Sequence, residues 1–402
     1  MGHIATGSDL ATTGHHPKNV WGSDLVVHTA AAGEDNPEII EAKRLGIPLV
    51  ERAEFLASIA HKYENLIAVS GTHGKTTATA MLAEIFKPKN PTVHIGGDYE
   101  GCTDYIGGKQ FFITEACEYK KSFLYLYPSF ALVLNAELDH TDCYSSYTDY
   151  FDAFKTFCRQ SKAAAVFGDD LSLSALAKKY GYISFGLDTK NDIHANNIRQ
   201  GFLTSSFEVV AYGQNLGTVT LKVGGTHNIQ NALGAIAAAL HFGLSFEDIQ
   251  AGLLRFKTVG RRFEFLGEIN GTEVYSDYAH HPTEIDAMIR EAKESGKKVV
   301  VVFEPHTYTR TKSLYKEFAD SLSKADRVYL MPIYSARETP IDGVTSDLIV
   351  KEMQTKEASA QSIIGYSELF KDLSNTLIPN ENILVFCGAG TIDTWARKFC
   401  DL

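Results

Sequence analysis

Long apolar runs and an excess of basic residues are both missing from this sequence. No stretch of the 402 residues reaches the roughly 18 apolar residues that a membrane-spanning helix needs, so we expect no membrane association. Lys and Arg number 38 against 49 Asp and Glu, and the formal net charge is −11. We therefore expect no nucleic-acid partner, because binding to phosphate backbones needs clustered cations. A small anionic ligand in a local basic pocket is compatible with this charge.

Cysteine is also scarce, and no two cysteines form a C-x-x-C pair. The opening stretch MGHIATGSDLATTGHHPKNV lacks a charged start followed by an apolar core, so we expect no secretion signal. Scattered thiols without an export signal predict a cytoplasmic protein with reduced cysteines. The cysteines are Cys102, Cys117, Cys143, Cys158, Cys387 and Cys400.

Short apolar runs alternate with helical patterns along most of the chain, which predicts an α/β fold with parallel sheets. Residues 23–50 show a strand, loop, helix, strand pattern, and a second series begins at residues 65–70. Residues 182–224 differ, because short alternating runs with glycine turns predict a small antiparallel patch. A third α/β block opens near Gly260. We therefore expect domains at 1–64, 65–259 and 260–402.

The stretch SGTHGKTT follows an apolar run and precedes a helical pattern, which is the context that a phosphate-binding loop requires. Gly71 and Gly74 would let the backbone approach an anion, and the start of the helix would point N–H groups at it. Lys75 would supply charge to phosphates and Thr76 a hydroxyl to Mg²⁺. A plain turn before a helix is the alternative, but a lysine and two threonines serve no packing need there.

This loop and several other stretches resemble the Mur ligase family, the ATP-dependent amide-bond ligases of peptidoglycan precursor synthesis. The other stretches are EACEYKKSFL, LNAELDHTDCY, GTHNIQNALGAIAA, GRRFEFLG, YSDYAHHPTEI and FEPHTYTRT. The last of these and the double histidine of AHHP are typical of the branch that adds L-alanine to UDP-N-acetylmuramate. The resemblance implies a three-domain α/β architecture. Its parts would be a truncated N-terminal Rossmann-like domain for the UDP substrate, a central P-loop ATPase domain and a C-terminal Rossmann-like domain for the amino acid.

The resemblance also implies ATP and Mg²⁺ as cofactors. ATP would convert a carboxylate into an acyl phosphate, which an amine then attacks, while the protein supplies positioning and charge neutralisation. Glu118 and His140 would join Thr76 as metal ligands; the alternatives are a solvated carboxylate and a capping histidine. The ATP loop would comprise Gly71, Thr72, His73, Gly74, Lys75, Thr76 and Thr77.

The remaining site residues are likewise implied by the resemblance. His227, Asn228 and Asn231 would contact adenine, or cap a helix and expose an amide. Arg262 would reach the ATP phosphates, since its planar charged fork suits that task, and Asp277 would hold the ribose. The catalytic set would be Lys75, His140, Arg262, His280 and Arg310.

Substrate contacts are expected from both ends of the chain. Tyr278, His280 and Arg310 would lie near the reacting carboxylate and the amino acid, with ordinary packing as the alternative for the first two. Thr29 and Asn36 would lie on the uridine side, HIGG at residues 94–97 would form a sugar-side loop, and Asn135 would touch the substrate. We do not expect Lys155 to be a carbamylated lysine.

The resemblance is broken at the start, where the glycine-rich turn that takes the UDP pyrophosphate is missing. UDP binding is therefore a separate question from ATP binding. Two other functions stay open: a ligase that attaches a ready-made tripeptide to the same sugar nucleotide, and a non-catalytic nucleotide-binding protein. The expected partners are small molecules, and the expected assembly is a monomer or homodimer.

Overall fold

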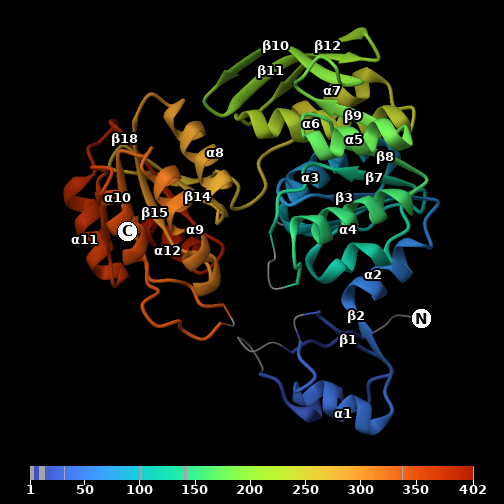
Figure 1. Ribbon diagram of the computed structural model, residues 1–402, viewed down its shortest axis with the longest axis horizontal. Helices are drawn as coiled ribbons and strands as arrows, with labels where there is room; N and C mark the ends of the chain where they lie inside the picture. Colours follow the sequence, from blue (N-terminus) through green and yellow to red (C-terminus); the bar gives the residue numbers. More distant parts are fainter. Residues whose placement is uncertain are drawn as a thin grey trace. The chain divides into compact units, whose positions relative to one another are not determined.

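A computed structural model describes residues 4–8, 14–30, 32–99, 102–139, 143–336 and 338–401 (Figure 1). The chain divides into two compact units. The first comprises Met1–Lys75, Pro88–His94 and Tyr105–Ile183, and the second Thr76–Lys87, Ile95–Asp104 and Ser184–Leu402. Among the described residues, every helix is too short or too polar to cross a lipid bilayer.

The first unit opens with a short parallel β-α-β arrangement, as predicted for residues 23–50. After η1 (Pro17–Val20), β1 (Val26–His28) pairs in parallel with β2 (Leu49–Glu51), and α1 (Pro37–Leu45) connects them. The helix ends where Gly46 adopts a left-handed conformation with φ of 69°. The helix α2 (Arg52–Ala60) leads on to the next strand.

A parallel sheet forms the rest of the first unit, which confirms the prediction of parallel pairing. Its order is β8 (Ala163–Phe167), β7 (Phe130–Val133), β3 (Asn65–Ser70), β6 (Phe111–Glu115), and then the start of β4 (Thr92–Tyr99). The stretch HIGG, expected as a loop, lies within β4. The expected loop conformation was wrong, because the stretch belongs to a strand in which His94 pairs with Thr114; a sugar contact stays a prediction. The other elements near this part of the chain are η2 (Lys87–Lys89), β5 (Cys102–Tyr105), η3 (Tyr119–Tyr125), α4 (Tyr147–Arg159) and α5 (Leu171–Tyr180).

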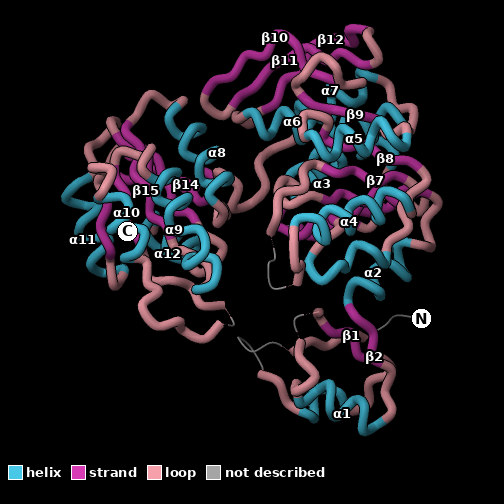
Figure 2. Tube along the Cα trace, in the orientation of Figure 1, coloured by secondary structure: helices cyan, strands magenta, loops and turns pink. Residues whose placement is uncertain are grey.

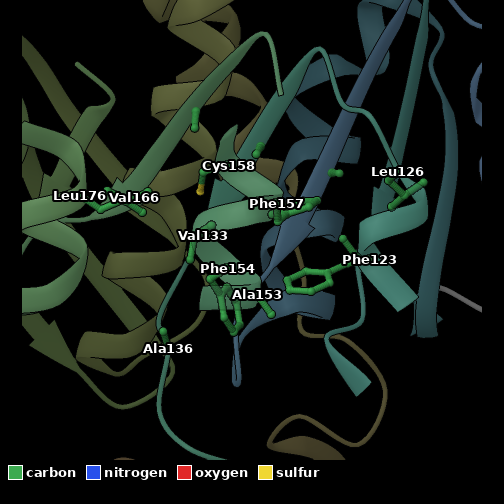
Figure 3. Packing of buried hydrophobic residues seen from close by; sticks show 14 of the residues in the cluster. Phe123, Leu126, Val133, Ala136, Ala153, Phe154, Phe157, Cys158, Val166 and Leu176 are labelled. Carbon is green, nitrogen blue, oxygen red and sulfur yellow. The ribbon is translucent and has the colours of Figure 1, made fainter. Parts of the chain in front are cut away.

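An aromatic cluster covers this parallel sheet. Phe123 stacks on Phe157 at a ring-centroid distance of 4.8 Å and meets Phe154 edge-on at 5.2 Å (Figure 3). All three side chains are almost completely buried. This packing fixes η3 and α4 against the sheet; Glu118 directly precedes η3 and Tyr150 lies in α4.

The second unit contains the antiparallel patch. β10 (Ile193–Gly201), β11 (Thr204–Ala211) and β12 (Gln214–Leu221) pair antiparallel, as expected. β9 (Ile183–Gly186) pairs in parallel with β10, so the expectation was wrong for this strand. Alternation marks a strand but does not encode the direction of its neighbour. The helices of this region are α3 (Lys75–Phe86), α6 (Thr226–His241) and α7 (Phe246–Arg255).

The C-terminal part of the second unit is an α/β layer, as predicted from residue 260 onward (Figure 2). The strand order is β13 (Glu264–Ile269), β14 (Thr272–Asp277), β18 (Asn382–Cys387), β15 (Lys298–Phe303), β16 (Arg327–Leu330), β17 (Ala360–Ser362). All neighbours are parallel except β13 and β14. Apolar cores lie on both sheet faces, under α8 (Pro282–Lys293), α9 (Tyr308–Leu322), α10 (Asp347–Gln354), α11 (Tyr366–Thr376) and α12 (Ile392–Cys400).

Candidate active site

The predicted phosphate loop joins β3 to α3, with the helix beginning at Lys75. Gly71 has φ of 144°, and a Cβ there would lie 3.1 Å from both the Asn135 backbone nitrogen and the Leu134 Cβ. Gly74 has φ of 84°. Both conformations favour glycine, because a side chain would be strained at these angles. The loop therefore needs its two glycines for its shape as well as for close approach to an anion.

Asn135 holds the phosphate loop from the segment that follows β7. Its Oδ1 accepts a hydrogen bond from the His73 backbone N–H at 2.8 Å, and its Nδ2 donates to the His73 carbonyl at 3.0 Å. Thr72 Oγ1 donates to the Glu137 carbonyl at 2.7 Å and lies 2.8 Å from the Tyr150 hydroxyl. Asn135, expected as a substrate contact, is thus bonded to the loop; its contact with substrate stays a prediction. Sequence reasoning missed Tyr150, which carried only the signal of an apolar helix face.

Lys75 is bonded to the loop and to Glu118. Its ammonium group donates to the carbonyls of Gly71 and Thr72 and lies 2.9 and 3.1 Å from the two carboxylate oxygens of Glu118. The Glu118 side chain is only 1% exposed. Burial by itself lowers the pKa of Lys75, but Glu118 together with Cys117 and Glu115 outweighs it, so the pKa is raised and the amine stays cationic. Tyr144 donates its hydroxyl hydrogen to the Glu118 carbonyl, which fixes this segment.

Two of the three predicted metal ligands, Thr76 and Glu118, lie in the described part of the chain. Thr76 and Glu118 offer a hydroxyl and a carboxylate, which are the hard oxygen donors that Mg²⁺ prefers. Thr76 lies in the second unit and Glu118 in the first. His140 lies outside the described residues. The metal site therefore stays a prediction.

The second unit contains a cavity of about 970 Å³, in the size range of small-molecule sites. Four cations face three carboxylates around it, together with glycine backbone and one aromatic ring. Such a wall suits a multiply charged anion, because backbone and guanidinium donors are close together. The lining residues are Thr76, Gly96, Gly97, Asp98, Lys257, Thr258, Gly260, Arg261, Arg262, Glu264, Tyr278, Asp393 and Arg397.

Two adjacent arginines lie over one tyrosine ring in this cavity. The guanidinium carbons of Arg261 and Arg262 are 4.6 and 5.1 Å from the centre of the Tyr278 ring. Arg262, the predicted phosphate ligand, lines the cavity and has its Nη1 3.9 Å from a Glu284 carboxylate oxygen. Sequence reasoning singled out Arg262 but not Arg261, although the doubled arginine of GRRFE was the available signal.

Asp277 braces the backbone around these arginines. Its two carboxylate oxygens accept hydrogen bonds from the backbone N–H groups of Phe263 and Ala279, each at 2.7 Å. Burial raises the pKa of Asp277 to about 6, against the opposing effects of Arg262 and the two N–H donors. Each oxygen keeps a second lone pair, so a ribose contact is compatible with these bonds and stays a prediction.

The predicted substrate residues of the C-terminal region lie together. The ring of His280 is 5.3 Å from that of Tyr278 and 5.9 Å from that of His306. Arg310 Nη1 lies 3.3 Å from His306 Nδ1. Burial lowers the pKa of His280 and outweighs the carboxylate of Glu284, so its imidazole is neutral near pH 7. His306 was missed, although it belongs to the quoted stretch FEPHTYTRT.

The predicted adenine residues begin α6. Asn228 Nδ2 donates to the Gly224 carbonyl at 2.7 Å, which helps to fix the start of the helix. Asn231 is buried, and His227 is the second residue of the helix. Desolvation and the nearby Arg262 guanidinium lower the pKa of His227, so its imidazole is neutral at pH 7. Contact with adenine stays a prediction for all three residues.

The predicted uridine-side residues have local roles in the first unit. Asn36 caps α1, because its side-chain oxygen accepts a hydrogen bond from the Glu38 N–H at 2.9 Å. The Thr29 carbonyl accepts one from the Ala32 N–H at 3.0 Å. Contact with a nucleotide stays a prediction for both.

Comparison with known proteins assigns the chain to a family. Residues 3–64 match the model described as Mur ligase family, catalytic domain; residues 69–239 match the Mur ligase middle domain; and residues 261–390 match the Mur ligase, glutamate ligase domain. A UDP-N-acetylmuramate–L-alanine ligase of Clostridium botulinum is 39% identical over 98% of this chain and 87% of its own length.

Solved structures agree with this assignment. The UDP-N-acetylmuramate-alanine ligase of Thermotoga maritima is 28% identical with a TM-score of 0.84, covering 96% of this chain and 86% of its own. A murein peptide ligase of Psychrobacter arcticus, 23% identical with a TM-score of 0.69 over 97% and 88% of the two chains, shares the fold. These findings confirm the predicted three-domain α/β fold, and the chain belongs to the Mur ligase family.

Proposed function

We propose that this chain is an ATP-dependent ligase that joins L-alanine to UDP-N-acetylmuramate in peptidoglycan precursor synthesis. The observation that carries the proposal is the phosphate loop, whose backbone is fixed by Asn135 and whose Lys75 is held beside Glu118. The nearly full-length similarity to relatives that bear this activity in their names supports the choice of substrates. ATP and Mg²⁺ would be the cofactors, and the cytoplasm, where ATP is held, the location.

The roles of the chain's own residues follow from their chemistry. The N–H groups of the loop and the start of α3 bind phosphate oxygens, and Lys75 neutralises charge on the transferred phosphoryl group. Arg262 binds phosphate from the cavity wall, and Asp277 keeps the backbone beside it in place. A bound Mg²⁺, held by Thr76, Glu118 and His140, would shield the charge between phosphate and carboxylate.

The reaction requires that a carboxylate oxygen attack the γ-phosphorus and that ADP leave, which gives an acyl phosphate. The amine of L-alanine then attacks the carbonyl carbon, and phosphate leaves as the amide forms. Arg310 would bind the carboxylate of the amino acid, because a guanidinium fork matches a carboxylate. The neutral imidazole of His280 would accept the proton that the amine loses.

The domain boundaries near residues 64 and 259 are part of this proposal.

The test is phosphate release from Mg-ATP with UDP-N-acetylmuramate, with and without L-alanine. We expect release that depends on L-alanine and that is lost in Lys75→Ala. Lys155→Ala is the matched control, because Lys155 forms only an exposed ion pair with Asp152 at 3.1 Å, and its activity should be unchanged. Release with the tripeptide but not with L-alanine would show a recycling ligase instead. ATP binding with no release for any acceptor would show a non-catalytic nucleotide-binding protein.

A further inference from the structure

Arg261 joins the start of the C-terminal α/β layer to a turn far along the chain. Its Nη2 donates to the carbonyl of Gly388 at 2.7 Å and to that of Gly390 at 3.3 Å, just past the end of β18. The same guanidinium lies 4.6 Å from the centre of the Tyr278 ring. One side chain thus connects three segments, and two of them line the cavity through Arg261 and Tyr278.

The backbone of Arg261 is held as firmly as its side chain. Its φ is 58°, a left-handed conformation that is rare for a residue with a side chain. Its N–H donates to a Glu264 carboxylate oxygen at 2.8 Å, and its carbonyl accepts from the Tyr278 N–H at 2.7 Å. Such a conformation persists only where the surroundings impose it, and it occurs often at functional sites.

Arg262 depends on this anchor because it is the next residue and shares the same ring. Its guanidinium lies 5.1 Å from the centre of the Tyr278 ring, and the nearest carboxylate oxygen, on Glu284, is 3.9 Å from its Nη1. That distance is too long for a strong hydrogen bond. The pose of the Arg262 side chain is therefore set by its backbone and by Tyr278, and both are bonded to Arg261.

We propose that Arg261 is a positioning residue that orients Arg262 toward the phosphates of ATP through Tyr278 and the Gly388–Gly390 turn. This proposal rests on the proposed function in one respect: it takes ATP as the ligand whose phosphates Arg262 binds. The Nη2 of Arg261 donates to two protein carbonyls, so we expect the effect of this residue on the ligand to pass through its neighbour Arg262.

The Arg261→Lys variant distinguishes an effect on the orientation of Arg262 from an effect on the stability of the fold. The buried Nε of Arg261 has no acceptor among the described residues, and such an orphan donor is unfavourable. Lysine keeps a cation that can donate to a carbonyl and removes this orphan. It lacks the planar fork that bridges two carbonyls and stacks on a ring. We therefore expect Arg261→Lys to unfold at the wild-type temperature or above, yet to bind and use ATP less well.

The test is a double-mutant cycle of Arg261→Lys and Arg262→Lys, measured on kcat/KM for ATP and on the Kd of Mg-ATP. We expect Arg261→Lys to lower kcat/KM about tenfold and Arg262→Lys about 100-fold. The double variant should lose no more than Arg262→Lys alone, because Arg261 acts only through Arg262. The control is Arg327→Lys: Arg327 lies 5.6 Å from the centre of the Tyr329 ring, is not among the residues that line the cavity, and should change neither quantity.

The cycle on Kd keeps this proposal separate from the proposed function. If the wild-type chain releases no phosphate with any acceptor but the two lysine variants are coupled in Kd, the ligase proposal fails and the positioning role holds. If the fold-change in Kd of the double variant equals the product of the two single fold-changes, Arg261 acts independently of Arg262, and the positioning role is overturned. Loss of affinity that tracks a lowered unfolding temperature in Arg261→Lys would also overturn it.

Discussion

The ammonium nitrogen of Lys75 lies 2.9 Å from one carboxylate oxygen of Glu118 and 3.1 Å from the other, and the carboxylate is almost fully buried. The lysine belongs to the phosphate loop and the glutamate to the segment after β6. A desolvated charge pair is stable only while both partners remain, since either charge alone would be buried without compensation. The pair therefore links the shape of the loop to the charge of the site.

Removing one member of this pair should destabilise the fold more than removing both. Lys75→Met leaves the Glu118 carboxylate without its partner, and Glu118→Gln leaves the Lys75 ammonium group without its partner. Each change should therefore lower the free energy of unfolding by about 3 kcal/mol. The double variant should recover most of the stability but no ATP turnover. Urea unfolding followed by fluorescence measures this. Lys155→Met, in an exposed pair, should cost less than about 1 kcal/mol. Additive losses in the double variant would contradict the coupling.

Gly71 should tolerate no side chain. Gly71→Ala places a Cβ 3.1 Å from the Asn135 backbone nitrogen at a φ that disfavours alanine, so both stability and Mg-ATP affinity should fall. The matched control is Gly46→Ala, which has φ of 69° and no atom within 4 Å of the added Cβ. It should cost only about 1 kcal/mol and leave ATP affinity unchanged. Thermal unfolding and calorimetric titration compare the two, and equal effects would refute the role of close packing.

Asp277 should make stability depend on pH. Its pKa is raised from 3.8 to about 6, so between these values the folded state holds a proton that the unfolded state has lost. Stability from this group is therefore present at the lower pH and falls as pH rises through the window, by about 3 kcal/mol at most. Asp277→Asn should remove this slope, and the exposed Asp342→Asn should keep it. Urea midpoints from pH 4 to 7 measure the difference, and parallel profiles would count against burial as its cause.

Glu291 should matter as a hydrogen-bond acceptor and not as a charge. This buried side chain accepts from the Leu203 N–H at 2.8 Å, and burial raises its pKa. Glu291→Ala removes the acceptor and should cost about 1–3 kcal/mol. Glu291→Gln keeps an oxygen without the charge, so its stability should match or exceed that of the wild type, increasingly as pH rises above 4.5. The exposed Glu294→Ala is the control. A Gln variant as unstable as the Ala variant would show that the charge itself is needed.

The alternation of apolar runs and helical patterns predicted the α/β layers well, because each strand or helix carries its own periodicity. It failed at β9, whose pairing with β10 is parallel. The family resemblance failed in a similar way at residues 94–97, where it implied a loop and the structure has a strand. Both failures concern a neighbour in space, which local periodicity does not specify.

The sequence by itself determined the phosphate loop, because glycine spacing, a lysine and a helix start within a few residues are a complete local signal. It also indicated the family, through the resemblance of this loop and several other stretches. Only the tertiary structure decided which groups hold that signal in place. Asn135 bonds to His73 across 62 positions, and Arg261 bonds to Gly388 across 127. Such contacts arise when packed strands bring their ends to one edge of a sheet, and no pattern within one segment records which distant residue will meet it there.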